Sequence, residues 1–179
     1  MELFWQAGYA GTSLDDIAAA TGVARPSLRA AFGDKHDIYL KALSDYWERK
    51  YATMREALAG DRPLGEALMS VYEAALSLYF SGGGRARGCF VVGTAVTEAL
   101  DDSGIRHNIA EGFRRLDAYF EERLRLAQDN GELKKSADPE VLALLASATL
   151  HSIAIRARSG AARSELRKLA TKVVKVICE

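Results

Sequence analysis

The chain has 179 residues, of which 49% are hydrophobic and 27% charged, and its formal net charge is zero. This length supports one substantial hydrophobic core or two small ones, and the composition excludes a disordered chain. The two cysteines, Cys89 and Cys178, are too few for the disulfide framework of a secreted domain, so we expect a cytoplasmic protein. The net charge of zero gives no support to a nucleic-acid partner, because nucleic-acid binders are often basic.

The sequence predicts an all-α fold. It contains only three prolines, and alanine-rich runs recur along it. No apolar run reaches the length of a membrane span, and the residues after Met1 do not form a signal peptide. We therefore expect no membrane partner.

The segment 12–32, T-S-L-D-D-I-A-A-A-T-G-V-A-R-P-S-L-R-A-A-F, predicts two short helices joined by a turn. Hydroxyl residues at its start are favourable N-caps, and Gly22 provides the backbone freedom that ends the first helix. Pro26 suits the first turn of the second helix, where its missing N–H costs nothing. We expect Leu28 and Phe32, one turn apart, to form the buried face of this helix. Two helices, a glycine turn and arginines on an open face are typical of a DNA-reading helix-turn-helix.

Helical periodicity continues through the rest of the chain. The segment 81–88 is glycine-rich and is predicted to be a mobile loop; no G-K-[ST] follows it, as a phosphate loop would require. The β-branched run 89–99 allows a strand or a helix, but a single strand in a helical chain would lack a pairing partner, so we predict a helix. The first predicted helix ends at Gly8. The other predicted helices cover 35–58, 63–80, 103–128, 139–158 and the residues after Gly160, with a turn at 60–63.

The residues from Gly8 to Lys35, G-Y-A-G-T-S-L-D-D-I-A-A-A-T-G-V-A-R-P-S-L-R-A-A-F-G-D-K, resemble the N-terminal domain of TetR-family transcriptional regulators. The resemblance implies a three-helix DNA-binding domain over 1–45 and a larger helical ligand-binding and dimerisation domain over 46–179, with about nine helices in all. In the family the first helix begins further upstream, so we expect the protein to extend before Met1. The implied function is a repressor that binds a palindromic operator as a homodimer and is released by a small molecule.

The resemblance also assigns DNA contacts. Arg25 matches a position at the start of the recognition helix that often touches bases or phosphates in the family, and arginine can grip guanine with two hydrogen bonds. Lys35 matches a lysine that commonly meets a phosphate. Many relatives carry a tyrosine and further aromatics in the stretch 29–31, where this chain has Arg-Ala-Ala, so the operator sequence cannot be inferred. Residues 1–50 carry six Lys/Arg against seven Asp/Glu, so this part of the chain is not basic. The full set of expected DNA contacts is Thr12, Arg25, Pro26, Ser27, Arg29, Ala30 and Lys35.

An effector pocket is expected in the C-terminal part, where polar or aromatic side chains interrupt otherwise aliphatic faces. For each such residue alone, core packing is the simpler interpretation; only the group suggests a pocket, and it does not identify the ligand. The candidate lining residues are Trp47, Tyr72, Phe80, Cys89, Phe90, Thr94, Thr97, His107, Phe113 and His151.

The last two predicted helices carry more apolar surface than one chain easily covers. Either they pack fully inside the monomer, or they form a four-helix bundle with a second copy across a two-fold axis. The resemblance favours the dimer, because members of the family dimerise through their last two helices. The expected interface residues are Leu145, Thr149, Ile153, Leu166, Leu169, Val173, Val174 and Ile177.

No catalytic arrangement is evident, and we expect neither an enzyme nor a bound cofactor or metal. The three histidines are scattered, and no nucleophile elbow occurs. Two alternatives remain open. Cys89 follows Arg85 and Arg87, which would favour a thiolate, so a thiol-based redox sensor is conceivable, although a small buried residue is the simpler interpretation. The neutral charge also allows a helical ligand-binding or scaffold protein whose helix-turn-helix no longer binds DNA.

Overall fold

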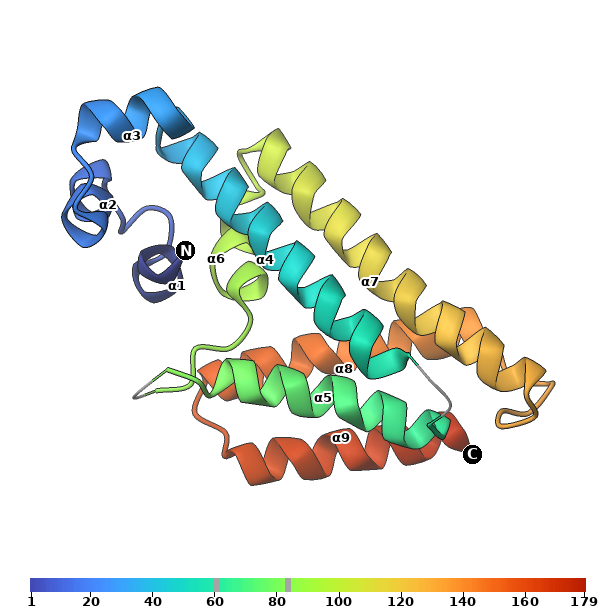
Figure 1. Ribbon diagram of the computed structural model, residues 1–179. Coiled ribbons are helices and arrows are strands. Elements are labelled where there is room, and N and C mark those ends of the chain that lie inside the picture. The colour runs from blue at the N-terminus through green and yellow to red at the C-terminus, as the bar shows by residue number, and fades with distance from the viewer. Residues whose placement is uncertain (60–61, 83–84) are drawn as a thin grey trace.

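The computed structural model describes residues 1–59, 62–82 and 85–179, and these residues form nine α-helices and no strand (Figure 1). The predicted all-α fold is therefore confirmed. The turn predicted at 60–63 and the loop predicted at 81–88 lie partly outside the described residues. The helices are α1 Glu2–Ala7, α2 Leu14–Thr21, α3 Arg25–Phe32, α4 Lys35–Leu58, α5 Leu64–Tyr79, α6 Phe90–Glu98, α7 Ser103–Asp129, α8 Pro139–Arg158 and α9 Arg163–Cys178.

The helix ends follow the capping signals in the sequence. Ser13 and Asp16 form a reciprocal capping box at the start of α2: each backbone N–H donates to the other residue's side chain, at 2.8 and 3.1 Å. Gly22 ends α2 in the left-handed conformation, with φ of 69°, which a residue with a β-carbon adopts only at a cost. Asp34 and Asp138 accept backbone N–H groups at the starts of α4 and α8.

Helices α1–α3 gather around one end of α4, which then runs on into the larger helical part (Figure 1). The buried side chains of these helices are Phe4 and Trp5 of α1, Ile17 of α2 and Leu28 of α3. The expectation that Phe32 is buried beside Leu28 is wrong, because its side chain is 46% exposed. Phe32 is the last residue of α3, so the helix ends before a packed face can continue past it.

In the larger part, α7 lies alongside α4, and α5, α8 and α9 lie side by side (Figure 1). α7 packs on α8, α5 on α9, and α4 on both α5 and α7. One continuous cluster of buried residues runs through all these helices and reaches α1–α3. The end formed by α1–α3 and the larger part therefore share a core, and α4 belongs to both.

By length and composition, helix α8 is long and apolar enough to cross a membrane, although we expected no apolar run of that length. Its packing explains this composition. One side of α8 is buried against α5, α6, α7 and α9, while its other side carries exposed apolar residues. A core helix with a second apolar face meets the same criterion as a membrane span.

Candidate DNA-binding surface and effector cavity

The candidate recognition surface is the exposed side of α3. Five of the seven predicted DNA contacts lie on it and are solvent-exposed: Arg25, Pro26, Ser27, Arg29 and Ala30. The helix begins after Ala24 without a side-chain cap, so the N–H groups of its first turn remain available to an oxyanion. This face offers two guanidinium groups, a hydroxyl and backbone donors together, which suits contact with phosphates and base edges.

Arg25 is held by its neighbour on α2. Its Nη1 lies 3.2 Å from both carboxylate oxygens of Asp15, and the two side chains are 54% and 70% exposed. An ion pair this exposed contributes little to stability. It orients the guanidinium, and a DNA contact made by Arg25 would have to exchange or share this partner.

The structure corrects the expected role of Thr12. Its side chain is only 2% exposed, and its hydroxyl donates to the Gly8 carbonyl at 2.8 Å, so it supports the α1–α2 connection rather than facing solvent. Lys35 is half-buried. Its Nζ donates to the Tyr9 carbonyl at 3.1 Å and lies 4.2 Å from the centre of the Tyr9 ring. Its phosphate contact stays a prediction.

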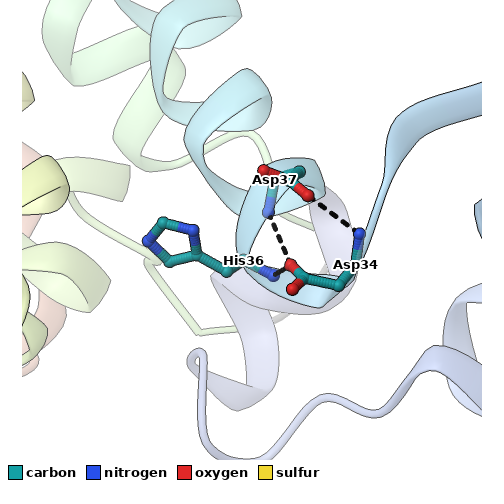
Figure 2. Close-up of side chains that lie close together, drawn as sticks. All are labelled: Asp34, His36 and Asp37. Carbon is teal, nitrogen blue, oxygen red and sulfur yellow. Dashed lines mark hydrogen bonds between the residues drawn. The ribbon is translucent and has the colours of Figure 1, made fainter.

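Beside α3, Asp34, His36 and Asp37 place their side-chain ligand atoms within 4.8 Å of one another. Figure 2 shows that both carboxylates are turned to the backbone at the start of α4: Asp34 accepts the N–H of His36 and Asp37, and Asp37 accepts the N–H of Asp34. His36 Nε2 lies 2.7 Å from Asp102 Oδ2, close enough for an ion pair but not aligned as a hydrogen bond. We assign this cluster to helix capping and to a contact between α4 and α7.

A cavity of about 220 Å³ lies between α1, α4 and α5, with Leu150 of α8 also lining it. Its wall is mostly apolar, with Tyr46, Met54 and Leu78 among its residues. Trp5 of α1 also lines it, so a helix of the α1–α3 end forms part of this cavity. A ligand bound here would touch both ends of the molecule.

The ten expected pocket residues do not line this cavity. Trp47 and His107 instead line a more open groove of about 290 Å³ between α4 and α7. The polar groups of the buried candidates have partners inside the core: Tyr72 Oη donates to the Ala146 carbonyl at 3.0 Å, and Thr94 Oγ1 lies 2.7 Å from Tyr39 Oη. These polar atoms on apolar helix faces therefore form hydrogen bonds inside the core and are not directed at a ligand. The remaining candidates are buried (Cys89, Phe90), half-buried (Phe80, Phe113, His151) or exposed (Thr97).

Cys89 lies inside the protein rather than in an accessible electropositive site. It is 2% exposed, and Tyr46 Oη donates to its Sγ at 3.2 Å. Arg87, expected to favour a thiolate, is instead paired with Glu2 at 2.6 Å and lies over the Trp5 ring. A reactive cysteine needs solvent access. The geometry therefore favours the buried structural role that the sequence also allowed.

The exposed apolar residues of α8 form one stripe, which we call the outer face of α8: Val141, Leu144, Leu145 and Ile155. They are 57%, 52%, 38% and 56% exposed. Val176 of α9 is 61% exposed. Contiguous apolar surface of this kind marks an interaction site more often than a solvated face.

The expected interface residues mostly lie elsewhere. Leu145 belongs to the outer face of α8, and Leu169 and Val173 are half-buried, but the other five lie in the core of the single chain. Because α8 is apolar all round, its sequence could not show which side packs inward. The five expected interface residues that are instead buried in the core are Thr149, Ile153, Leu166, Val174 and Ile177.

We expect the stability of the fold to depend on pH through His151. Burial, with a smaller effect of the Lys50 charge, lowers the pKa of His151 from 6.5 to about 4. The unfolded chain therefore takes up this proton first, and stability is lost as the pH falls from about 6.5 towards 4. The expected loss at pH 5 is about 2 kcal/mol. Urea unfolding of the wild type and of His151→Gln at pH 7 and pH 5 measures it.

The His151→Gln variant should lack this part of the pH dependence, whatever its stability at pH 7. His107 is exposed, and His107→Gln is the matched control that should keep the wild-type dependence. Equal slopes for the wild type and His151→Gln between pH 7 and pH 5 would contradict the prediction.

The helix-turn-helix, its exposed α3 and the larger helical part with its cavity define a helical DNA-binding regulator. The chain belongs to the TetR family of bacterial regulatory proteins. Residues 1–42 match the family described as bacterial regulatory proteins of the tetR family, and residues 65–173 match the tetracyclin repressor-like C-terminal domain.

Relatives and solved structures agree with this assignment. The chain is 29% identical over 170 residues to the HTH-type transcriptional repressor ComR of Escherichia coli (strain K12), covering 95% of this chain and 81% of the relative. It is 30% identical over 144 residues to the HTH-type transcriptional regulator YezE of Bacillus subtilis (strain 168), covering 80% and 73%. A TetR-family regulator, CifR, solved as a cysteine mutant with a 26bp double-strand operator DNA, superposes with a TM-score of 0.85 at 26% identity, over 96% and 90% of the chains. The chain is thus a transcriptional regulator, a role that involves no catalysis.

Proposed function

We propose that this protein is a cytoplasmic repressor that binds a palindromic operator as a homodimer and leaves it when a small molecule fills the α1/α4/α5 cavity. The observation that carries the proposal is the position of this cavity. Its wall includes Trp5 of α1 and Tyr46 of α4, so a ligand would contact both the DNA-binding end and the helix that connects it to the rest. Residues 1–45 would act as the DNA-binding domain and 46–179 as the effector and dimerisation domain, with the boundary inside α4.

Contacts between the two parts support this coupling. Tyr39 of α4 is bonded to Thr94 of α6 through their hydroxyls, and burial raises the pKa of Tyr39 to about 12, so this phenol stays neutral. At the end of α6, Asp102 caps α7 and meets His36 of α4. A shift of α4 or α6 on ligand binding would therefore move the start of α4 and, with it, the end of α3.

The outer face of α8 supports the homodimer. In a two-fold dimer this stripe would meet its own copy, and two recognition helices would face successive major grooves, about 34 Å apart. A ligand that changes the spacing between the two α3 helices would weaken binding without touching the DNA surface.

Arg25 provides the test of DNA recognition. Arg25→Ala should weaken operator binding by about 1–3 kcal/mol, or roughly five- to 150-fold, because it removes a charged donor at the start of α3. The measurement is a mobility shift at fixed salt, on a fragment enriched from genomic DNA by the protein. Arg114→Ala is the matched control, since Arg114 is an exposed arginine of α7 paired with Glu111.

Unchanged binding by Arg25→Ala, with binding by the wild type intact, would remove Arg25 from the recognition surface. Failure of the wild type to enrich any fragment at low salt would instead favour the scaffold alternative, in which the helix-turn-helix does not bind DNA.

A further inference from the structure

Three of the residues that line the cavity each carry a buried nitrogen donor without a hydrogen-bond partner within the described part of the chain. The three donors are Trp5 Nε1, Lys50 Nζ and Arg87 Nε. Trp5 as a whole is only 2% exposed. A buried donor without an acceptor carries a free-energy cost, which is larger when the group is charged. All three are donors, so what is missing at this wall is an acceptor.

The charges of the lining residues also indicate that an acceptor is missing. Arg49, Lys50 and Arg87 all line the cavity, while Glu2 is the one carboxylate among its described lining residues. Glu2 is already engaged, because its Oε2 lies 2.6 Å from Arg87 Nη1. The lining residues therefore carry an excess of positive charge. Lys50 Nζ is buried without a carboxylate partner among the described residues and lies 5.4 Å from the centre of the Trp47 ring. Water would satisfy the hydrogen bonds of this ammonium, but it would not neutralise its charge.

The rest of the cavity is apolar and small. Tyr46, Met54, Val71, Leu78 and Leu150 line it, contributed by α4, α5 and α8. Its volume of about 220 Å³ exceeds the 150 Å³ of an engineered cavity that holds benzene, so it accommodates roughly nine non-hydrogen atoms. That is the size of one aromatic ring or a short alkyl chain with a polar group attached.

We propose that the effector is a small organic carboxylate whose anionic group binds at Lys50, Trp5 and Arg87 and whose apolar body lies between α4 and α5. The proposal rests on the proposed function for its regulatory meaning and adds the chemical class of the ligand. A carboxylate accepts several hydrogen bonds and supplies the missing negative charge, whereas an alcohol or amide of the same shape supplies only acceptors. Since Trp5 belongs to α1 and Lys50 to α4, one carboxylate would join these helices.

The test is calorimetric titration of the full chain with benzoate, phenylacetate and hexanoate, each paired with its neutral primary amide. At least one carboxylate should bind at least tenfold more tightly than its amide. Lys50→Met keeps an unbranched side chain, one atom shorter, and removes its charge, and it should weaken carboxylate binding by about 10- to 100-fold. Lys50→Arg should recover most of the affinity, and Trp5→Phe, which removes only the indole donor, should weaken it less than Lys50→Met.

The matched control is Lys41→Met, because Lys41 is an exposed lysine of the same helix and does not line the cavity. It should bind carboxylates like the wild type. Circular dichroism checks that each variant is folded, and Lys50→Arg and Trp5→Phe keep the test valid if Lys50→Met does not fold. No binding by any carboxylate, equal binding by an amide, or carboxylate binding that does not change in Lys50→Met would each overturn the proposal.

A mobility shift with the same probes separates this inference from the proposed function. Lys50-dependent carboxylate binding that leaves the operator complex intact would support the ligand class and contradict ligand-driven release. Release by the amides that does not depend on Lys50 would overturn the carboxylate assignment and leave the proposed function standing.

Discussion

Replacing Leu144 and Ile155 together by glutamate is expected to convert the protein to a monomer and to weaken operator binding by about 100-fold or more. Both side chains are more than half exposed on the outer face of α8, so in a two-fold dimer each would meet its copy or a neighbour of its copy. Charges placed there would be buried against like charges. A monomer contacts one half-site only and loses the gain in effective concentration that the second half-site provides.

Light scattering after size exclusion measures the first effect, because one chain has a mass of 19.5 kDa. The mobility shift measures the second. Stability of the single chain should change by less than about 1 kcal/mol, since both sites are exposed in it. Leu100→Glu is the control, because Leu100 is 76% exposed but lies after α6. A double variant that stays dimeric would exclude the outer face of α8 as the interface.

Gly112→Ala is expected to destabilise the protein by about 3 kcal/mol, although alanine is the better helix former. Gly112 lies in α7 where that helix meets α4, and a β-carbon there would sit 2.1 Å from Cε2 of Trp47. The indole cannot simply turn away. Trp47 is 3% exposed, its Nε1 donates to Asn108 Oδ1 at 3.1 Å, and its ring stacks on Tyr51. The helices must separate or the indole must give up these contacts.

Urea unfolding of Gly112→Ala and of Gly65→Ala makes a matched comparison. Gly65 lies in α5, and a β-carbon there would have its nearest neighbour at 3.7 Å, so this variant should be as stable as the wild type or more stable, by up to about 1 kcal/mol. If Gly112→Ala behaves like Gly65→Ala, close packing of α7 on α4 at Trp47 is not needed for stability.

Much of the fold could be predicted from local chemistry. Capping side chains, the turn glycines and apolar spacing act within a few residues, so they predicted α2, α3, the full length of α4 and the helical state of α6. The family motif from Gly8 to Lys35 likewise predicted the helix-turn-helix and the class of regulator. These features depend on neighbours in the chain, which the sequence contains directly.

Which residues form the candidate sites depends on which sides of the helices pack together, and only the tertiary structure decided that. Phe32 was expected to be buried and is exposed, and Thr12 was expected to face DNA and is buried. Lys50 was assigned no role, yet it lines the cavity and its ammonium is buried without a hydrogen-bond partner among the described residues.

The sequence by itself therefore determined the helices, their ends and the DNA-binding class. The tertiary structure decided where the cavity lies, which side of α8 is left apolar and exposed, and which polar atoms lack partners. The physical reason is that burial and hydrogen bonding are set by residues distant in the chain. A helix that is apolar on all sides, such as α8, carries no local sign of which side faces the core.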